Sequence, residues 1–277
     1  MSTTTAQAAR PAALPAPHGR AGLAGALRSE FTKIRSVRST FWTLLAVIVI
    51  TVGLGALFSW GTASHWSQMA PADRATFDAT ATSLAGLILG QLVIVVLGAL
   101  TITSEHSTGM IRTSLTAMPR RGVVYAAKAI VFTTVALVVG WITSFAAFFL
   151  GQALLSGKHI DATLAQPHVL RAVIGGGLFL AACGLLAFGI GAALRHTAGA
   201  ITASIGLLFV LFILANFLPE SWRVHVSKWL PFNAGSQIWA TRPGAHLFSA
   251  WAGFAVFCGY AAIALLVGLI MFLRRDA

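Results

Sequence analysis

The segment from Gly151 to Lys158 is the part of the sequence that comes nearest to a phosphate-binding loop. It reads Gly-Gln-Ala-Leu-Leu-Ser-Gly-Lys and is followed by His159. A phosphate-binding loop needs four residues between its glycines and Ser or Thr after the lysine, because the loop amides cradle the phosphates and the hydroxyl binds Mg²⁺. This segment has five residues between the glycines and a histidine after the lysine. We therefore predict that the chain has no ATP site of its own.

Metal-ligating and catalytic patterns are also missing from the sequence. None of the eight His residues lies in an H-E-x-x-H pattern, and Cys183 and Cys258 both lie in apolar runs. The sequence has no recognisable Ser/His/Asp set and no paired carboxylates inside an apolar run. These observations predict no metal site, no catalytic residues and no cofactor bound by this chain, so it is not expected to be an enzyme.

The composition excludes a water-soluble globule. Hydrophobic residues make up 57% of the chain and charged residues only 9%, whereas about a quarter of the residues in a soluble domain are charged. A net charge of +12 would suggest a nucleic-acid partner in a soluble protein. Here the Lys and Arg residues gather mostly at the ends of long apolar runs, so we predict contact with membrane lipids and no nucleic-acid partner.

Six intervals without charged residues are long enough to cross a bilayer, whose hydrocarbon core of about 30 Å requires about 20 helical residues. We therefore predict an all-α membrane protein with six transmembrane helices. Their expected positions are 41–60, 83–103, 129–151, 172–194, 198–218 and 249–273. Only Arg195, His196 and Thr197 separate the fourth and fifth intervals, which predicts either a tight helical hairpin or one bent element.

The distribution of positive charge predicts the orientation of the chain. If the N-terminus is cytoplasmic, 13 of the 19 Lys and Arg residues lie inside and six lie outside. Both termini are then cytoplasmic. Residues 1–22 are rich in Ala and Pro and lack the apolar core of a signal peptide, so we expect a disordered cytoplasmic tail before a six-span domain at 23–277.

Residues 23–37 precede the first span and have an amphipathic pattern. Leu23, Leu27, Phe31 and Ile34 are spaced by four, four and three residues, with charged residues on the other faces. This spacing predicts a helix lying in the plane of the lipid head groups. The alternative is a cytoplasmic extension of the first span.

In the loop at 107–119, between the second and third spans, Ile111, Leu115 and Met118 fall at helical spacing. Gly109 marks a break before these residues, and Pro119 can end the short helix that they form. The pattern predicts a short amphipathic helix that faces a partner surface. The alternative is an ordinary loop whose positive charges only set the orientation.

Residues 219–245 follow the fifth span and are unusually rich in aromatic residues, including Trp222, Trp229 and Trp239. Irregular backbone at membrane depth must be covered by protein or water. We therefore expect short broken helices that re-enter the outer membrane interface. The alternative is a belt of aromatic anchors.

Inside the spans, small and polar residues replace charged ones. Gly86 and Gly90 form a G-x-x-x-G pair, which favours close helix packing within one subunit, with a dimer seam as the weaker alternative. Gln91 and Asn216 are candidates for helix packing or for lining a pathway. No charged residue lies near the centre of any span, which disfavours a proton-driven or sodium-driven carrier.

Three segments have residue combinations that, together with six spans, are similar to those of one transporter family. The matching residues are Leu27–Leu45, Glu105–Gly109, Arg112, Leu115, Pro119, Arg121 and Leu230–Gly235. In this combination the chain resembles the permease subunits of type-2 ABC exporters, particularly the short permeases of actinobacteria. The resemblance covers nearly the whole chain from about residue 23.

The resemblance implies roles for particular segments. In that family, the N-terminal helix and the loop after the second span contact a separate cytoplasmic ATPase, and two permease copies or paralogues form the pathway. Residues 23–37 would be the connecting helix, 107–119 the coupling helix, and 219–245 the segment that closes the external side. The implied ATPase-coupling residues are Glu105, Gly109, Met110, Ile111, Arg112, Leu115 and Pro119, and the implied outer-gate residues are Trp229, Pro231 and Asn233.

The resemblance thus implies a permease in a bacterial plasma membrane, powered by an ABC ATPase dimer that holds ATP and Mg²⁺. The resemblance also implies export out of the cell, and the uncharged, apolar spans add the expectation of an amphipathic cargo, either drug-like or lipid-like. The alternative is an ATP-independent membrane carrier or a membrane assembly factor.

Overall fold

The computed structural model describes residues 22–107, 120–242, 244 and 246–274. The expected tail at 1–22 therefore lies almost wholly outside the described residues, as does the expected coupling helix at 107–119 apart from its first residue.

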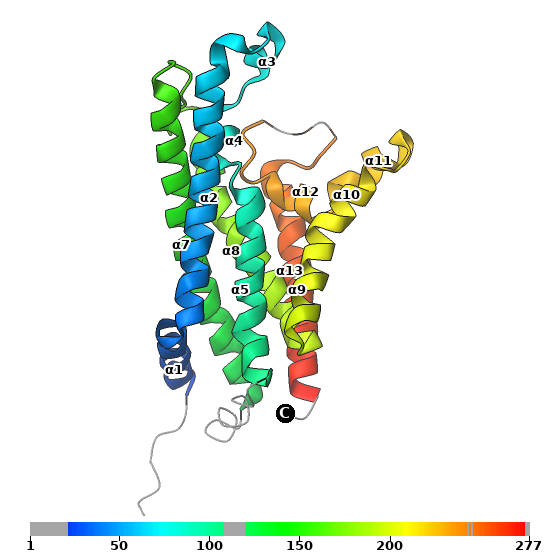
Figure 1. Cartoon of the computed structure of the whole chain (residues 1–277). Helices are drawn as coiled ribbons and strands as arrows, with labels where there is room; N and C mark the ends of the chain where they lie inside the picture. Colours follow the sequence, from blue (N-terminus) through cyan, green and yellow to red (C-terminus); the bar gives the residue numbers. More distant parts are fainter. Residues whose placement is uncertain (1–21, 108–119, 243, 245, 275–277) are drawn as a thin grey trace, which may run out of the picture.

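The described chain is a bundle of helices, six of which are long and apolar enough to cross a membrane (Figure 1). This confirms the prediction of an all-α membrane fold with six spans. The candidate spans are Arg38–Gln68, Ala79–Glu105, Arg121–Ser156, Val169–Leu194, Thr197–Ala215 and Ala250–Arg274. Successive spans run in opposite directions, so the first helix of the chain and the end of the last helix lie at the same end of the bundle.

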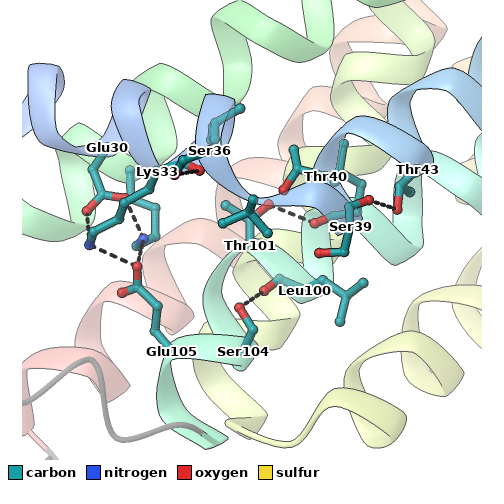
Figure 2. Close-up of a pocket in the computed structure, with 14 residues that line it drawn as sticks. Glu30, Lys33, Ser36, Ser39, Thr40, Thr43, Leu100, Thr101, Ser104 and Glu105 are labelled. Carbon is teal, nitrogen blue, oxygen red and sulfur yellow. Dashed lines mark hydrogen bonds and ion pairs between the residues drawn. The ribbon is translucent and has the colours of Figure 1, made fainter.

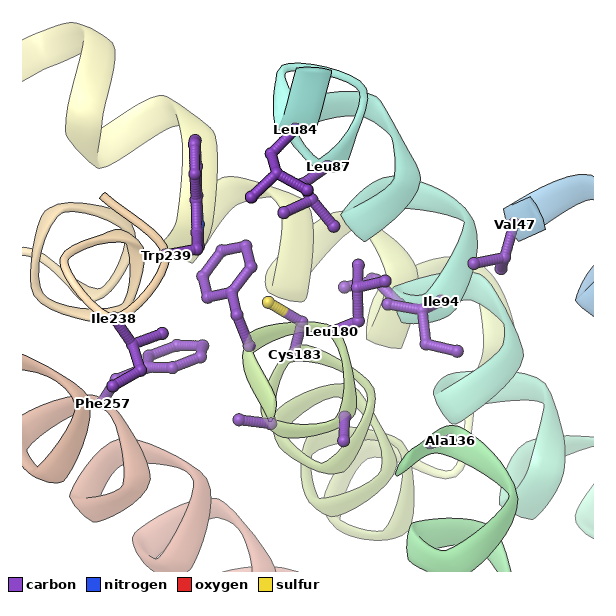
Figure 3. Close-up of a cluster of buried hydrophobic side chains, with 14 of the residues drawn as sticks. Val47, Leu84, Leu87, Ile94, Ala136, Leu180, Cys183, Ile238, Trp239 and Phe257 are labelled. Atoms are coloured by element: carbon purple, nitrogen blue, oxygen red, sulfur yellow. The ribbon is translucent and has the colours of Figure 1, made fainter. Parts of the chain in front are cut away.

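Helix α8 (Val169–Leu194) forms the centre of the bundle, and 78% of its most apolar stretch is buried. It packs against α5 (Leu87–Ser107), α7 (Arg121–Ser156) and α13 (Ala250–Arg274). Glycines on α8 permit this, because a Cβ at Gly189 would overlap the backbone of α13. Figure 3 shows α8 side chains at the middle of the apolar core.

Helix α2 (Arg38–His65) is the least buried span, at 17% of its most apolar stretch. It packs against α4 (Ala79–Leu84), α5 and α7 and turns its remaining apolar surface outward. The fifth and sixth spans are also only 22% buried over the same length. In a bilayer, such faces are covered by lipid or by another protein subunit.

The helix before the first span, α1 (Leu23–Ser36), is separate from α2. Val37 between them has an extended backbone (φ −82°, ψ 113°), which ends the helical hydrogen bonding. Residues 23–37 therefore do not continue the first span as one unbroken helix. Helix α1 packs against α7 at one end of the bundle (Figure 1).

The fourth and fifth spans form the tight hairpin that their short separation allows. Arg195 has a left-handed backbone (φ 57°) directly after α8, and α9 (Thr197–Ile205) then runs back along the bundle. The Nδ1 atom of His196 accepts a hydrogen bond from the Gly199 amide and caps α9. The span continues through a π-helical turn and ends with α10 (Leu211–Ala215).

Short helices follow the fifth span, as the aromatic-rich composition predicts. They are α11 (Glu220–Val226), a 3₁₀ turn (Ser227–Trp229) and α12 (Pro231–Ser236). Helix α12 packs against α13, at the opposite end of the bundle from α1 (Figure 1). Another short helix, α3 (Pro71–Thr76), lies at this same end.

Candidate functional site

Four charged side chains meet where α1, α5 and α7 converge at one end of the bundle (Figure 2). They are Glu30, Lys33, Glu105 and Lys128, which we call the charge cluster. Glu30 and Lys33 are three residues apart and therefore share a face of α1. Glu105 lies near the end of α5, and Lys128 lies two turns into α7.

Each ammonium group in the charge cluster bridges both carboxylates. Lys128 Nζ donates to Glu30 Oε2 at 2.6 Å and to Glu105 Oε1 at 2.8 Å. Lys33 Nζ donates to Glu30 Oε1 at 2.8 Å and to Glu105 Oε1 at 3.0 Å. Since the residues are far apart in sequence, these contacts fasten three helices to one another.

The charge cluster is mostly buried. Lys128 is only 3% exposed and Glu105 6% exposed. Removing two charges from water costs several kcal/mol per ion, and only close pairing with further hydrogen bonds offsets this cost. Here each buried ion has such partners, so the arrangement is stable as a unit and sensitive to the loss of any member.

Lys33 is the most exposed member of the charge cluster. Burial alone would lower the pKa of Lys33, but its hydrogen bonds to Glu30 and Glu105 outweigh burial, so the pKa is raised. A raised pKa on a cationic group stabilises the fold at neutral pH, and this stabilisation is lost only as the pH rises through that raised value.

The structure corrects two sequence expectations about this site. The third span was expected to begin at residue 129, after the charge of Lys128, but α7 begins at Arg121 and contains Lys128. A charged residue that is paired with opposite charges can lie inside such a helix. The expected start at residue 129 treated Lys128 as unpaired and therefore as a boundary. Glu30 was expected on a polar face of α1, but it is buried and accepts a hydrogen bond from Lys128 of α7.

The four expected interfacial residues flank the contact surface of α1 and do not form its centre. Leu23 and Phe31 are exposed, whereas Leu27 and Ile34 are half-buried. The buried centre of this face consists of Ala26 and Glu30. The apolar stripe is therefore left partly open for contact with lipid or protein.

Of the expected ATPase-coupling residues, the structure describes only Glu105, and it places this residue in the charge cluster. The others lie outside the described residues. They are Gly109, Met110, Ile111, Arg112, Leu115 and Pro119.

The glycine pair packs within the subunit. A Cβ at Gly86 would overlap the backbone carbonyl of Thr51 on α2, and one at Gly90 would overlap the Thr51 hydroxyl. Gln91 is fully buried nearby, where its Oε1 accepts a weak hydrogen bond from Cys183 of α8. Asn216 is not part of this group, because it lies exposed after α10 and donates to its own helix.

The three expected outer-gate residues lie around α12. The Trp229 carbonyl accepts a hydrogen bond from the Tyr260 hydroxyl of α13 at 2.9 Å. Pro231 is buried and begins α12. Asn233 Nδ2 donates to the Ser227 carbonyl at 2.9 Å and so ties α12 to the turn before it.

Arg171, which the sequence analysis did not single out, anchors the end of this outer segment. Its guanidinium donates to the carbonyls of Gln237 and Ile238 at 3.1 Å and to that of Ala240 at 2.8 Å. These carbonyls follow α12, and Arg171 lies in the first turn of α8. The sequence shows that Arg171 is a basic residue near the end of a span, but it does not reveal the three backbone carbonyls that accept its hydrogen bonds.

We expect Arg171→Met to loosen the outer segment and to lower the free energy of unfolding by about 1–3 kcal/mol, because buried carbonyls would lose a charged donor. Thermal unfolding of the purified protein in detergent measures this change. Arg223→Met is the control, since Arg223 makes only an exposed ion pair with Glu220. Equal stability of the two variants would contradict the anchoring role of Arg171.

Within the described part of the chain, no group of three or more His, Cys, Asp or Glu residues is placed to hold a metal ion. The chemistry of the charge cluster is the mutual neutralisation of buried ions, which positions helices.

Comparison with known protein families identifies a match over most of the chain. Residues 26–216 match a family model described as ABC-2 family transporter protein. The matched region includes most of α1, all four residues of the charge cluster and the first five spans. No curated protein matches the chain.

Proposed function

Because the chain belongs to the ABC-2 family of transporter proteins, we propose that it is the permease subunit of an ATP-driven exporter. Membership makes it a membrane-spanning component of an ABC transporter. A separate cytoplasmic ABC ATPase dimer supplies the ATP and Mg²⁺ sites, and a second permease copy or a paralogue completes the pathway. The cargo is an amphipathic molecule, drug-like or lipid-like, which suits the uncharged interior of the spans.

The single observation that carries this proposal is that two residues of the charge cluster, Glu105 and Lys128, flank residues 108–119 in the sequence. Glu105 lies shortly before this segment and accepts a hydrogen bond from Lys33 of α1, and Lys128 lies shortly after it and donates to Glu30 of α1. Buried ion pairs thus attach both flanks of the segment to the bundle. A partner that pushes on the segment would move α5 and α7 together, because their ends are joined.

This arrangement supports a coupling role for residues 107–119 and a connecting role for α1. ATP binding would draw two ATPase subunits together, and each permease would follow through its coupling helix. A ligand shifts such an equilibrium only through different contacts in the two states. The permease therefore supplies helices that move as a unit, and the ATPase supplies the free energy.

The proposed orientation places the charge cluster and both chain ends in the cytoplasm of a bacterial cell, with the permease in its plasma membrane. The excess of Lys and Arg in the segments at this end supports it. Segment 219–245, at the opposite end, would close the external side. The exposed apolar faces of α2, α10 and α13 remain for lipid or for the second permease.

A mild-detergent pull-down that recovers a P-loop ATPase is the first test, followed by reconstitution with that ATPase. We expect Ile111→Asp and Arg112→Glu to reduce ATPase stimulation by the permease by about fivefold or more, a typical lower bound for coupling between sites. The control is Lys158→Glu, an exposed change after α7 at the opposite end of the bundle.

Two results would contradict the proposal. One is normal assembly with unchanged ATPase stimulation in both coupling variants. The other is transport of cargo by the purified chain without an ATPase, which would support an ATP-independent carrier. The proposed orientation would be contradicted if an external, membrane-impermeant thiol reagent labelled a Met110→Cys variant in intact cells.

A further inference from the structure

A cavity of about 340 Å³ lies beside the charge cluster, between the α1–α2 junction and α5 (Figure 2). This volume falls within the range of small-molecule sites. Three exposed residues, Ser36, Val37 and Ser39, line the cavity at the junction, so it opens to the surface there. The coupling proposal gives this cavity no role.

The cavity changes from polar to apolar along the bundle. Lys33, Glu105 and Lys128 line its polar end, whereas Leu97 and Leu100 line it further along α5. Eight residues separate Leu97 from Glu105, which corresponds to about 12 Å along a helix. The polar end lies near the helix ends and the apolar end lies deeper in the span. An amphiphile lying in one leaflet has the same gradient of polarity.

The hydroxyl groups that line the cavity present acceptors. Thr43 and Thr101 each donate their hydroxyl proton to a carbonyl one turn earlier in their own helix, at 2.8 Å and 2.7 Å. Ser36 likewise donates to the Lys33 carbonyl at 3.1 Å. A hydroxyl that has donated its proton has only lone pairs left to offer. A ligand that carries hydrogen-bond donors would therefore find acceptors at these three hydroxyls.

The charge cluster adds to this surplus of acceptors. The two ammonium groups bind three of the four carboxylate oxygens, and the fourth, Glu105 Oε2, is buried without a hydrogen-bond partner among the described residues. The Lys33 and Lys128 ammonium groups are both engaged by carboxylates. An anionic group placed here would face two carboxylates whose charges are already balanced, whereas a cationic donor would meet favourable acceptors.

We propose that this cavity binds the head group of a membrane phospholipid that carries a primary ammonium group, such as phosphatidylethanolamine. The ammonium group would donate to the hydroxyl oxygens of Thr43 and Thr101, and the first part of an acyl chain would lie along Leu97 and Leu100. Arg38 is exposed and lies between Val37 and Ser39, which line the cavity, so its charge would attract the lipid phosphate.

Exposed apolar residues next to the opening support a lipid as the occupant. Phe41 is 61% exposed and Trp42 is 65% exposed, and both lie on α2 within one turn of residues that line the cavity. Aromatic side chains of this kind gather at membrane interfaces. The opening therefore lies where a lipid head group is already present at high local concentration.

The test is lipid retention by the purified full-length chain, measured by native mass spectrometry after exchange into micelles with equal amounts of phosphatidylethanolamine and phosphatidylcholine. Choline keeps the positive charge but has no N–H donor. We expect phosphatidylethanolamine to be retained about tenfold better, the factor that corresponds to one charge-assisted hydrogen bond. Phosphatidylglycerol, which has no ammonium group, is a third arm.

Thr43→Val and Thr101→Val remove the hydroxyl acceptors at almost unchanged volume, and we expect the double variant to retain the two lipids equally. Thr134→Val is the matched control, because Thr134 makes the same type of hydrogen bond to its own helix but lies on α7 outside the cavity. Equal retention of the three lipids by the unmodified chain would overturn the proposal, as would preferential retention of phosphatidylglycerol. So would an undiminished preference in the double variant.

Discussion

Replacing Lys128 with Met is expected to lower the free energy of unfolding by about 3–5 kcal/mol, the usual cost of breaking a buried ion pair by removing one partner. Lys128 is 3% exposed and is the only ion that bonds Glu30 Oε2 among the described residues. Methionine is unbranched and only one atom shorter than lysine, so the loss is chiefly that of the ammonium group. Thermal or SDS-induced unfolding of the purified protein measures the change.

Two further variants separate charge balance from packing. Lys158→Met removes an exposed charge and is expected to leave stability unchanged. The double variant Lys128→Met, Glu105→Gln removes one charge of each sign, so we expect it to be less destabilised than Lys128→Met alone. A double variant at least as unstable as the sum of its single changes would show that the charges do not balance each other.

The second large effect is expected at Gly86, where Gly86→Ala should destabilise the protein by about 1–3 kcal/mol. The added methyl group would overlap the Thr51 carbonyl, and a backbone atom cannot move aside as a flexible side chain can. The second span would have to shift away from the first. Unfolding in detergent, compared with the unmodified chain, measures the loss.

Gly53→Ala is the matched control for this change, because Gly53 lies on α2 with nothing within 4 Å of its added Cβ. There, alanine should raise stability slightly, by up to about 1 kcal/mol, through its better helix propensity. If Gly86→Ala left the subunit stable and only dissociated an oligomer, the glycine pair would belong to a dimer seam, contrary to the packing on Thr51.

The spans were predictable because the requirement that defines them is local. A bilayer needs about 20 consecutive residues without unpaired charge, and this can be counted along the chain. The shortness of the connection at Arg195 limited the fourth and fifth spans to a tight hairpin or one bent element, and the structure has the hairpin. The separate helix α1 followed from the spacing of Leu23, Leu27, Phe31 and Ile34.

The charge cluster could not be predicted from local patterns, because its pairs join residues that are far apart in sequence. Lys128 was treated as the boundary of the third span, which placed the start of that span too late. A lysine whose acidic partners are distant in sequence cannot be recognised as paired, so it was counted as the end of the apolar run. Glu105 was identified only through the resemblance to a family. The partners of Arg171 are backbone carbonyls, which carry no signal in the side-chain sequence.

The ion pair between Glu30 and Lys128 joins positions 98 residues apart, and this separation constrains the order of biogenesis. When α1 leaves the ribosome, Lys33 can already pair with one oxygen of Glu30, but Lys128, which binds the other oxygen, has not yet been synthesised. The N-terminal helix therefore cannot complete its contacts with the bundle until the translocon has released the third hydrophobic segment. Only then does the nascent chain contain Lys128, to which the N-terminal helix is bound in the folded protein.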